Sequence, residues 1–275
     1  MTPLDAVHEV ARDLGEAGVP SPRVDAEHLV AYVLGQTRSG LYASDEALSV
    51  GELGRLRPLV ERRRAREPLA YVLGEWGFRR LLLAVDRRAL IPRPETEVVV
   101  ERCLAHLERL SAPRVLDVGT GSGAIALALA DEHRGVEVVA IDRSRDALAL
   151  TRKNLARADV NGRVRLVGGN LLDGVRGPFD LVVSNPPYVP AGEYGSLQPE
   201  IRLYEPYEAL VGDRVWELIA RAAREVLRRD GHLVLECGDG QAPAVSAGLL
   251  SLGYKDVLVT PDLAGRDRVV EARRP

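Results

Sequence analysis

The residues from which metal centres and disulfide frameworks are built are scarce in this sequence. Its 275 residues include two cysteines and five histidines. Cys103 and Cys237 stand far apart, without the paired spacing of a zinc site, and no two histidines are separated by four positions. The sequence therefore predicts no metal site and no disulfide framework, and it predicts that both thiols are buried.

Long hydrophobic runs are also missing. A helix that crosses a bilayer needs about 20 mostly apolar residues in a row, and no segment approaches that length. The first residues include Asp5 and Glu9, whereas a secretion signal starts with basic residues and continues into an apolar stretch. These observations predict a protein without a membrane partner, and the cytoplasm as its default location.

A large excess of positive charge is absent as well. The formal net charge is -3, whereas a dedicated nucleic-acid binder normally carries a strongly basic face. We therefore expect no stable nucleic-acid partner. One basic run, diluted by Glu61 and Glu67, is interpreted as a solvated helix face, since charge runs usually lie in water. It comprises Arg55, Arg57, Arg62, Arg63, Arg64 and Arg66.

Helical signals fill the amino-terminal part of the chain. Thr2-Pro3 and Ser21-Pro22 each place a capping residue before a proline at the first helical position. Ser49 with Glu52 forms a capping-box pattern ahead of a third apolar series. We predict a small helical domain over residues 1–75 and, because the pattern then changes to short apolar runs, a β-hairpin-like connector over 76–92.

After a helix that follows Pro94, strands and helices are predicted to alternate from residue 114 onward. Such alternation is typical of an α/β domain with a doubly wound, mostly parallel sheet, here over residues 93–275. The last two strands are separated only by a short turn, which favours an antiparallel hairpin at the sheet edge. The predicted strands cover residues 115–118, 136–141, 164–167, 181–184, 232–237, 257–259 and 269–271.

A glycine-rich loop follows the first of these strands and opens a helix. It reads Asp117-Val118-Gly119-Thr120-Gly121-Ser122-Gly123, and its glycines let a ligand lie against the backbone at a helix N-terminus. Asp142 ends the next strand, where a carboxylate can accept hydrogen bonds from ribose hydroxyls. The glycine spacing differs from that of a dinucleotide fingerprint and resembles the Rossmann-like class I methyltransferase loop.

This loop predicts S-adenosylmethionine as the cofactor. Asp117 is expected to support its ammonium group through water, Asn170 to bond the adenine edge and Leu171 to cover the adenine face. A purely structural turn is the alternative for the loop, and an ordinary turn is the alternative for 170–171. The predicted cofactor-binding residues are Asp117, Gly119, Thr120, Gly121, Ser122, Gly123, Asp142, Asn170, Leu171 and Asn185.

The fourth strand runs into the segment that carries the chemistry, Asn185-Pro186-Pro187-Tyr188. An amide nitrogen is a poor nucleophile and must be held in line for attack. The Asn185 side-chain carbonyl and the Pro186 main-chain carbonyl can accept its two N–H groups, and the prolines stiffen the turn. Tyr188 offers a flat face for packing against a planar acceptor. Asn185, Pro186 and Tyr188 are the predicted catalytic residues of a methyltransferase acting on a planar amide or amine nitrogen.

Further motifs make the chain resemble the peptide chain release factor glutamine methyltransferase family over nearly its full length. The segment Ile91-Pro92-Arg93-Pro94-Glu95-Thr96-Glu97 is the most discriminating, because nucleic-acid methyltransferases that share the Asn-Pro-Pro-Tyr pattern lack it. The family usually has Asp where Asn170 stands. The other matching stretches are Glu67-Pro68-Leu69-Ala70-Tyr71 with Gly74, Tyr204-Glu205-Pro206 with Ala209-Leu210, Glu236 with Gly238 and Gln241, and Asp262-Leu263-Ala264-Gly265-Arg266-Asp267-Arg268.

The resemblance implies an enzyme that transfers a methyl group from S-adenosyl-L-methionine to the glutamine side-chain amide of the Gly-Gly-Gln motif in bacterial release factors. It also implies that the amino-terminal helices dock this protein partner. The acceptor side would be formed by Asn185, Pro186, Pro187 and Tyr188 together with Arg93 and Glu95.

Three alternatives are weighed against this function. An adenine-specific nucleic-acid methyltransferase would hold an exocyclic amine with the same two carbonyls, but it would need more excess positive charge. A non-catalytic S-adenosylmethionine-binding module would keep the loop and would not need a stiff turn that presents carbonyls. A nicotinamide oxidoreductase is supported only by the loop, and the glycine spacing counts against it.

Overall fold

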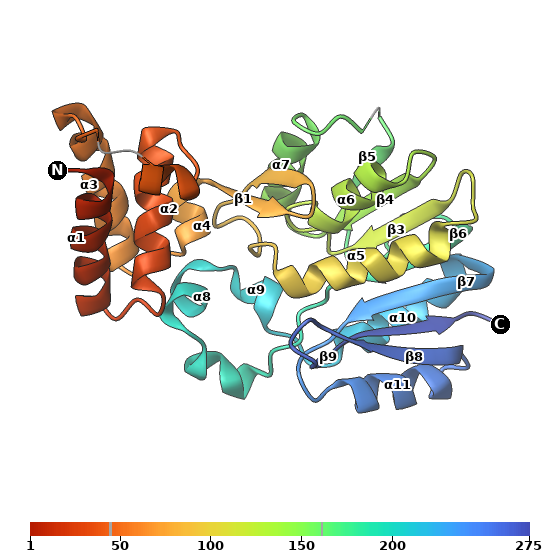
Figure 1. The fold of residues 1–275 in the computed structure, drawn as a ribbon. Coiled ribbons are helices and arrows are strands. Elements are labelled where there is room, and N and C mark those ends of the chain that lie inside the picture. Colours follow the sequence, from red (N-terminus) through yellow and green to blue (C-terminus); the bar gives the residue numbers. More distant parts are fainter. Residues whose placement is uncertain (44–45, 161) are drawn as a thin grey trace. The chain divides into compact units, whose positions relative to one another are not determined.

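The computed structural model describes residues 1–43, 46–160 and 162–275, which form two compact units (Figure 1). The helical unit comprises Met1–Glu75 together with Leu197–Tyr204, and the sheet unit comprises Trp76–Ser196 and Glu205–Pro275. Periodicity predicted the helices of the first unit and the strands of the second. It gave no sign that a segment near residue 200 belongs with the amino-terminal helices.

The helical unit buries an apolar core that includes Leu14, Leu29 and Leu41. Thr2 and Ser49 both cap their helices through capping boxes, as predicted. Ser21 stands at the N-cap of its helix with Pro22 at the start of the helix, as predicted, although its side chain makes no capping hydrogen bond. The elements are α1 (Pro3–Glu16), α2 (Pro22–Leu34), η1 (Ser39–Ala43), α3 (Val50–Arg64), α4 (Leu69–Leu73) and α8 (Pro199–Tyr204).

The arginine run of α3 is only partly a solvated face. Arg63 is 4% exposed and donates to Asp25 at 2.7 Å and to Glu200 of α8 at 2.9 Å. Arg66 donates twice to the same Glu200 carboxylate, both times at 2.7 Å. The interpretation as a solvated face is therefore wrong for Arg63, because a carboxylate distant in the sequence supplies the partner that permits a buried guanidinium.

The sheet unit contains a small two-stranded sheet and a seven-stranded sheet in the order β5-β4-β3-β6-β7-β9-β8. Neighbouring strands from β5 to β7 are parallel, and β9 pairs antiparallel with both β7 and β8. This confirms the doubly wound sheet with an antiparallel edge hairpin. The strands are β1 (Glu75–Phe78), β2 (Leu81–Ala84), β3 (Arg114–Val118), β4 (Glu137–Asp142), β5 (Val164–Gly168), β6 (Phe179–Ser184), β7 (Leu227–Glu236), β8 (Lys255–Pro261) and β9 (Asp267–Arg273).

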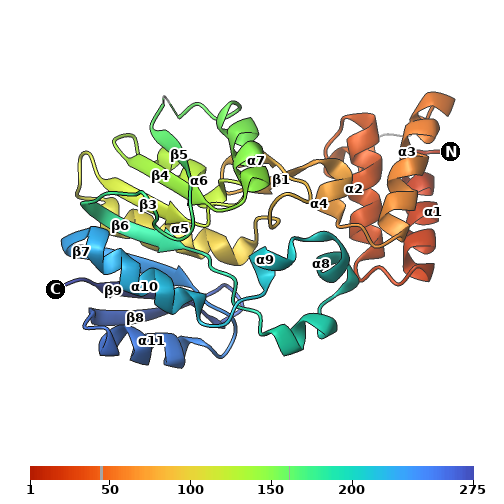
Figure 2. The same cartoon turned by 180° about the vertical axis from the view of Figure 1, so that it is seen from behind.

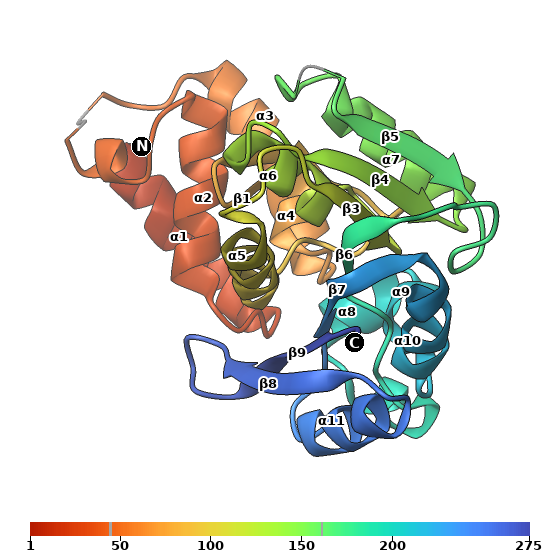
Figure 3. The ribbon, with the colours of Figure 1, turned by 90° about the vertical axis from the view of Figure 1, so that its right-hand side faces the viewer.

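Helices cover both faces of the large sheet. Side chains of α5 and α6 share one buried cluster with the strands, and those of α10 and α11 share the other. Figure 1 shows α5 in front of the strands, Figure 2 brings α10 to the front, and Figure 3 views the layers from the side. The helices are α5 (Pro94–Leu107), α6 (Ala124–Glu132), α7 (Arg145–Leu155), η2 (Ala191–Ser196), α9 (Tyr207–Leu210), α10 (Val215–Val226) and α11 (Ala242–Ser251).

Both cysteines are buried and free, as predicted. Within the part of the chain that the structure describes, no helix has the length and apolar character needed to cross a bilayer. Among the same residues, no group of three or more histidine, cysteine or acidic side chains is placed to hold a metal ion.

Candidate active site

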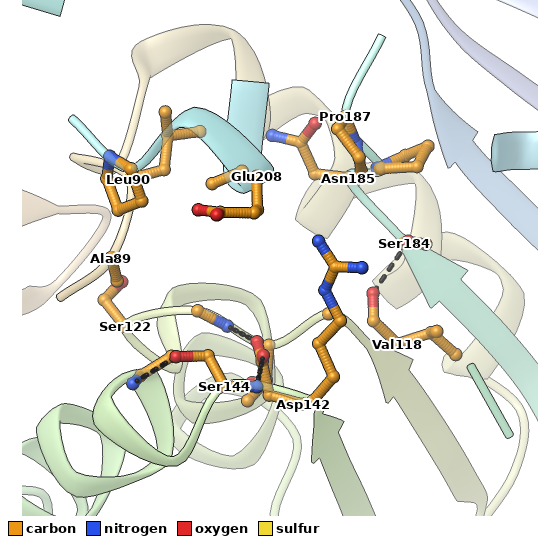
Figure 4. Close-up of a pocket in the computed structure, with 18 of the residues that line it drawn as sticks. Ala89, Leu90, Val118, Ser122, Asp142, Ser144, Ser184, Asn185, Pro187 and Glu208 are labelled. Carbon is orange, nitrogen blue, oxygen red and sulfur yellow. Dashed lines mark hydrogen bonds between the residues drawn. The ribbon is translucent and has the colours of Figure 1, made fainter. Parts of the chain in front are cut away.

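A cavity of about 290 Å³ lies at the carboxyl ends of the parallel strands of the sheet unit (Figure 4). This is the edge of an open α/β sheet at which ligands usually bind. Its wall is formed by segments that are distant in the sequence: residues 88–93, the turn 119–122, residues 141–144, residues 169–171, residues 184–187, and parts of 206–219. The structure thus brings the predicted cofactor loop and the predicted acceptor segment to one cavity.

The glycine loop turns sharply because three of its glycines have positive φ, at 74°, 58° and 87°. A Cβ added at Gly119 would meet nothing within 4 Å, which leaves room for a ligand against the backbone. A Cβ at Gly123 would lie 2.6 Å from the Thr151 side chain. Gly119 to Ser122 line the cavity, whereas Gly123 caps α6 and lies outside the cavity wall. Gly123 is thus required for close packing against Thr151, and its predicted contact with the cofactor stays a prediction.

Asp142 ends β4 and lines the cavity. One carboxylate oxygen accepts from the Gly121 N–H at 2.9 Å and the other from the Ser144 N–H at 2.8 Å. Figure 4 shows Asp142 beside Ser144 at the cavity. Each carboxylate oxygen can accept more than one hydrogen bond, so Asp142 fixes the loop and still has acceptor capacity for hydroxyl groups in the cavity.

Asp117 lies beneath the loop instead of in the cavity wall. It is 1% exposed, and one carboxylate oxygen accepts from the Thr120 hydroxyl at 2.7 Å. The other oxygen has no hydrogen-bond partner among the described residues. Burial raises the pKa of Asp117 to about 7. Asp117 therefore holds Thr120 in the turn, and its predicted contact with the cofactor through water stays a prediction.

Asn170 and Leu171 both line the cavity, at the position predicted for them. Leu171 has a positive φ of 51°, and the Asn170 carbonyl accepts from the Asp173 N–H at 3.0 Å. The segment is thus a tight turn whose unusual backbone directs residues 170–171 toward the cavity.

The acceptor segment enters the cavity only in part. Asn185, Pro186 and Pro187 line it, whereas Tyr188 does not. The Tyr188 carbonyl accepts from Gln241 at 2.9 Å, and a Cβ at Gly238 would lie 3.0 Å from the Tyr188 ring. Burial, with the nearby Glu236 carboxylate, raises the pKa of Tyr188 to about 12. The Tyr188 ring lies next to Gly238 and outside the cavity wall, so its packing against a planar acceptor stays a prediction.

The Arg-Pro-Glu-Thr-Glu segment contributes to the wall through Arg93 and Thr96. Arg93 forms an ion pair with the buried Glu205, which also accepts from the Ile91 N–H at 3.3 Å. This pairing ties the two segments that flank the acceptor side. Glu95, predicted to bind substrate, lies in the first turn of α5 and outside the cavity wall.

A buried chain of hydrogen bonds leads away from Asn185. Its side-chain Nδ2 donates to the Thr96 hydroxyl at 3.3 Å, and that hydroxyl donates to Glu236 at 2.7 Å. Burial raises the pKa of Glu236 to about 7. Sequence reasoning gave neither Thr96 nor Glu236 a role, since their motifs lie on different elements, α5 and β7, and spacing alone does not join them.

Other residues in or behind the cavity wall were also missed from the sequence. Arg143 follows Asp142 directly, and Glu208 of α9 presents its side chain to the cavity in Figure 4. Asn154 of α7 lies behind the wall and donates to the Ser122 carbonyl at 2.9 Å and to the Ala84 carbonyl at 3.0 Å. Of these three residues, only Arg143 could have been found from the sequence, because it directly follows the aspartate that ends a predicted strand.

Comparison with known proteins agrees with this arrangement. The family model described as PrmC N-terminal domain matches residues 5–74, and the one described as Methyltransferase small domain matches residues 98–197. A release factor glutamine methyltransferase of Deinococcus radiodurans is 42% identical and covers 98% of this chain and 98% of its own. One from Geobacter sulfurreducens is 42% identical and covers 94% of this chain and 92% of its own.

The fold is found in solved structures as well. A methyltransferase from Pyrococcus furiosus superposes with a TM-score of 0.50 at 20% identity, covering 70% of this chain and 88% of that one. A likeness at this identity shows the fold alone. It confirms the class I methyltransferase architecture predicted for the sheet unit.

Proposed function

The chain belongs to the release factor glutamine methyltransferase family, and we propose that it transfers a methyl group from S-adenosyl-L-methionine to the side-chain amide nitrogen of the Gly-Gly-Gln glutamine in bacterial release factors. One observation supports this most strongly. Asn185 and Pro186 line the same cavity as the glycine loop and Asp142, so an amide acceptor and a nucleoside-bearing donor have room side by side.

The residues present fit this cofactor. The open side of Gly119 admits a ligand against the backbone, and Asp142 supplies acceptor oxygens for ribose hydroxyls. Asn170 and Leu171 offer a polar and an apolar contact for a purine. When bound, S-adenosylmethionine supplies an activated methyl group on a sulfonium.

On the acceptor side, the chain's own groups hold and orient the amide. The Asn185 side-chain carbonyl and the Pro186 carbonyl would accept one N–H group each, which directs the nitrogen lone pair toward the donor. The same oxygens would stabilise positive charge as it develops on nitrogen. Pro186 and Pro187 keep the turn stiff because proline fixes φ. The amide proton can be lost to water after transfer.

An adenine-specific nucleic-acid methyltransferase is the second candidate, because an exocyclic amine fits the same two carbonyls. Such enzymes read a flipped base partly by stacking it on an aromatic ring. Tyr188 would be that ring, and it packs outside the cavity wall. The position of Tyr188 does not separate the two candidates, because its ring was predicted to pack against either planar acceptor. The near full-length similarity to release factor glutamine methyltransferases favours the protein substrate.

A parallel methylation assay tests the proposal. Purified release factor and DNA are offered separately with labelled S-adenosylmethionine, and the product is mapped by mass spectrometry. We expect label on the release factor at the Gly-Gly-Gln glutamine. Labelled DNA together with unlabelled release factor would overturn the assignment.

Asn185→Ala tests the role of the acceptor carbonyl. Removal of one preorganised oxygen is expected to lower kcat by about 100-fold or more, while affinity for S-adenosylmethionine falls far less. Single-turnover kinetics and cofactor titration measure the two effects. Equal losses of turnover and cofactor affinity would mean that Asn185 mainly holds the cofactor.

A further inference from the structure

The hydrogen-bond chain behind Asn185 has a direction that follows from its chemistry. A threonine hydroxyl has one proton to donate and lone pairs with which to accept. The Thr96 hydroxyl lies 2.7 Å from a Glu236 carboxylate oxygen and 3.3 Å from the Asn185 amide nitrogen. When Glu236 is ionised, its carboxylate only accepts, so the threonine proton goes to Glu236, and the threonine oxygen must accept from Asn185.

This direction decides how the Asn185 amide is turned. The two ends of an asparagine amide have nearly the same shape, and either can face a neighbouring group. With Nδ2 committed to Thr96, the carbonyl Oδ1 is the amide atom that remains for a group in the cavity, which Asn185 lines. A turned amide would instead present N–H donors to the N–H groups of an incoming amide, and two donors repel each other.

Burial makes the chain of contacts rigid. Thr96 is 5% exposed and Glu236 is 2% exposed, and both are held by regular structure, in the first turn of α5 and at the end of β7. Breaking a buried hydrogen bond costs more free energy than breaking one in water, because the groups that lose their partner cannot bond to water instead. Two elements of the scaffold thus fix the orientation of one cavity side chain.

We propose that Thr96 is a positioning residue, oriented by Glu236, that fixes the Asn185 amide with its carbonyl available to the acceptor nitrogen. The inference rests on the proposed function and deepens it, because it assigns a role to Thr96 that is exerted through Asn185, and a role to Glu236, which lies outside the cavity wall. It also explains why Asn185 needs a hydroxyl partner, where a purely apolar neighbour would leave its amide free to turn.

Thr96→Val and Thr96→Ser test this directly. Valine keeps the shape and removes the hydroxyl, so kcat on release factor should fall by about 10-fold or more, while KM and cofactor affinity change little. Serine restores the hydroxyl and should restore most of kcat. Thr260→Val, the same change on edge strand β8, serves as the control and should leave kcat unchanged. Wild-type kcat in Thr96→Val would overturn the proposal.

A double variant separates positioning from simple damage. If Thr96 acts only through the Asn185 amide, Thr96→Val should lower kcat no further once Asn185→Ala is present. Independent, multiplicative losses would contradict the proposal.

The pH profile gives another readout. Glu236 is surrounded by Arg93, Glu95, Tyr188, Cys237 and Arg268, and burial raises its pKa to about 7. Protonated Glu236 can donate to Thr96, which frees the threonine proton for Asn185 and permits the turned amide. Wild-type kcat should therefore fall as the pH drops through about 7, and Glu236→Gln should lack this step. A step that persists in Glu236→Gln would contradict the role of Glu236.

A measurement without turnover distinguishes failure of this inference from failure of the proposed function. In NMR spectra, the Asn185 side-chain NH2 protons should show close contacts to the Thr96 methyl group in the wild-type protein. Their absence would overturn the positioning role even if release factor is methylated. If these contacts are present but release factor is not methylated, the proposed function is wrong and the orientation of the Asn185 amide is still established.

Discussion

At the residue scale, the single carboxylate of Asp142 connects two segments of the cavity wall, the glycine loop and the start of α7. It fixes the glycine loop through Gly121 and the start of α7 through Ser144, while it also lines the cavity. Substitution of Asp142 should therefore affect ligand binding more than substitution of a surface aspartate, because it alters the shape of the glycine loop as well as the contacts of the carboxylate with the ligand.

Asp142→Asn is expected to weaken binding of S-adenosylmethionine by about 10- to 100-fold, since hydrogen bonds to a charged group contribute about 1.5–3 kcal/mol. Calorimetric titration measures this. Asp146→Asn is the matched control, because that aspartate is exposed in the first turn of α7 and lies outside the cavity wall. Equal affinities of the two variants would argue against a ligand contact by Asp142.

The sequence predicted which segments meet at the site better than which side chains enter it. Gly119 to Ser122, Asp142 and Asn185 lie in the cavity wall because strand ends in a parallel sheet share one edge. Asp117 and Tyr188 belong to the same motifs, yet neither lines the cavity. Asp117 is buried beneath the loop, and the Tyr188 ring lies next to Gly238. Spacing identifies the loop, whereas the direction of a side chain depends on its neighbours in three dimensions.

At the scale of elements, α8 shows how a short helix is held by charge instead of by periodicity. Its six residues could not be predicted as part of the helical unit, because the apolar pattern of so short a segment carries little information. Glu200 receives hydrogen bonds from Arg63 and Arg66, and the Tyr204 hydroxyl donates to the Ala65 carbonyl at 2.7 Å. These contacts were beyond prediction, since their partners are far apart in the sequence.

Glu200→Ala is expected to destabilise the helical unit by about 3 kcal/mol, because Arg63 loses one of its two carboxylate partners while it stays buried. Urea unfolding followed by circular dichroism measures the change. Glu61→Ala is the control, since Glu61 forms an exposed pair with Arg64 in the same unit and should matter far less. Similar effects of both substitutions would contradict a stabilising role for the buried network.

The ion pairs of Glu200 with Arg63 and Arg66 also make the stability of the helical unit depend on pH in a predictable direction. Burial raises the pKa of Glu200, but hydrogen bonds from Arg66 and Arg63 outweigh burial and lower it below its ordinary value. A carboxyl with a lowered folded-state pKa contributes stability above its unfolded-state pKa and loses it as the pH falls through the folded-state value. The difference in stability between the wild type and Glu200→Ala should therefore shrink on acidification.

At the scale of the whole molecule, the cavity belongs to one of the two units. Every residue of the cavity wall belongs to the sheet unit, so we propose that cofactor binding and methyl transfer depend on that unit. The helical unit contributes no cavity residue among those described, and it matches the family model described as PrmC N-terminal domain. We propose that it recognises the protein substrate.

Hydrogen exchange with the full chain tests this division of labour. S-adenosylmethionine alone should slow exchange at 119–122 and 141–144 and leave α1, α2 and α3 unchanged, because a ligand stabilises the structure that it contacts. Release factor should add protection in the helical unit, since docking covers exposed groups there and orders their side chains. Added protection confined to the sheet unit would mean that the amino-terminal helices do not dock the substrate. Because the comparison uses intact protein, loss of folding cannot mimic either result.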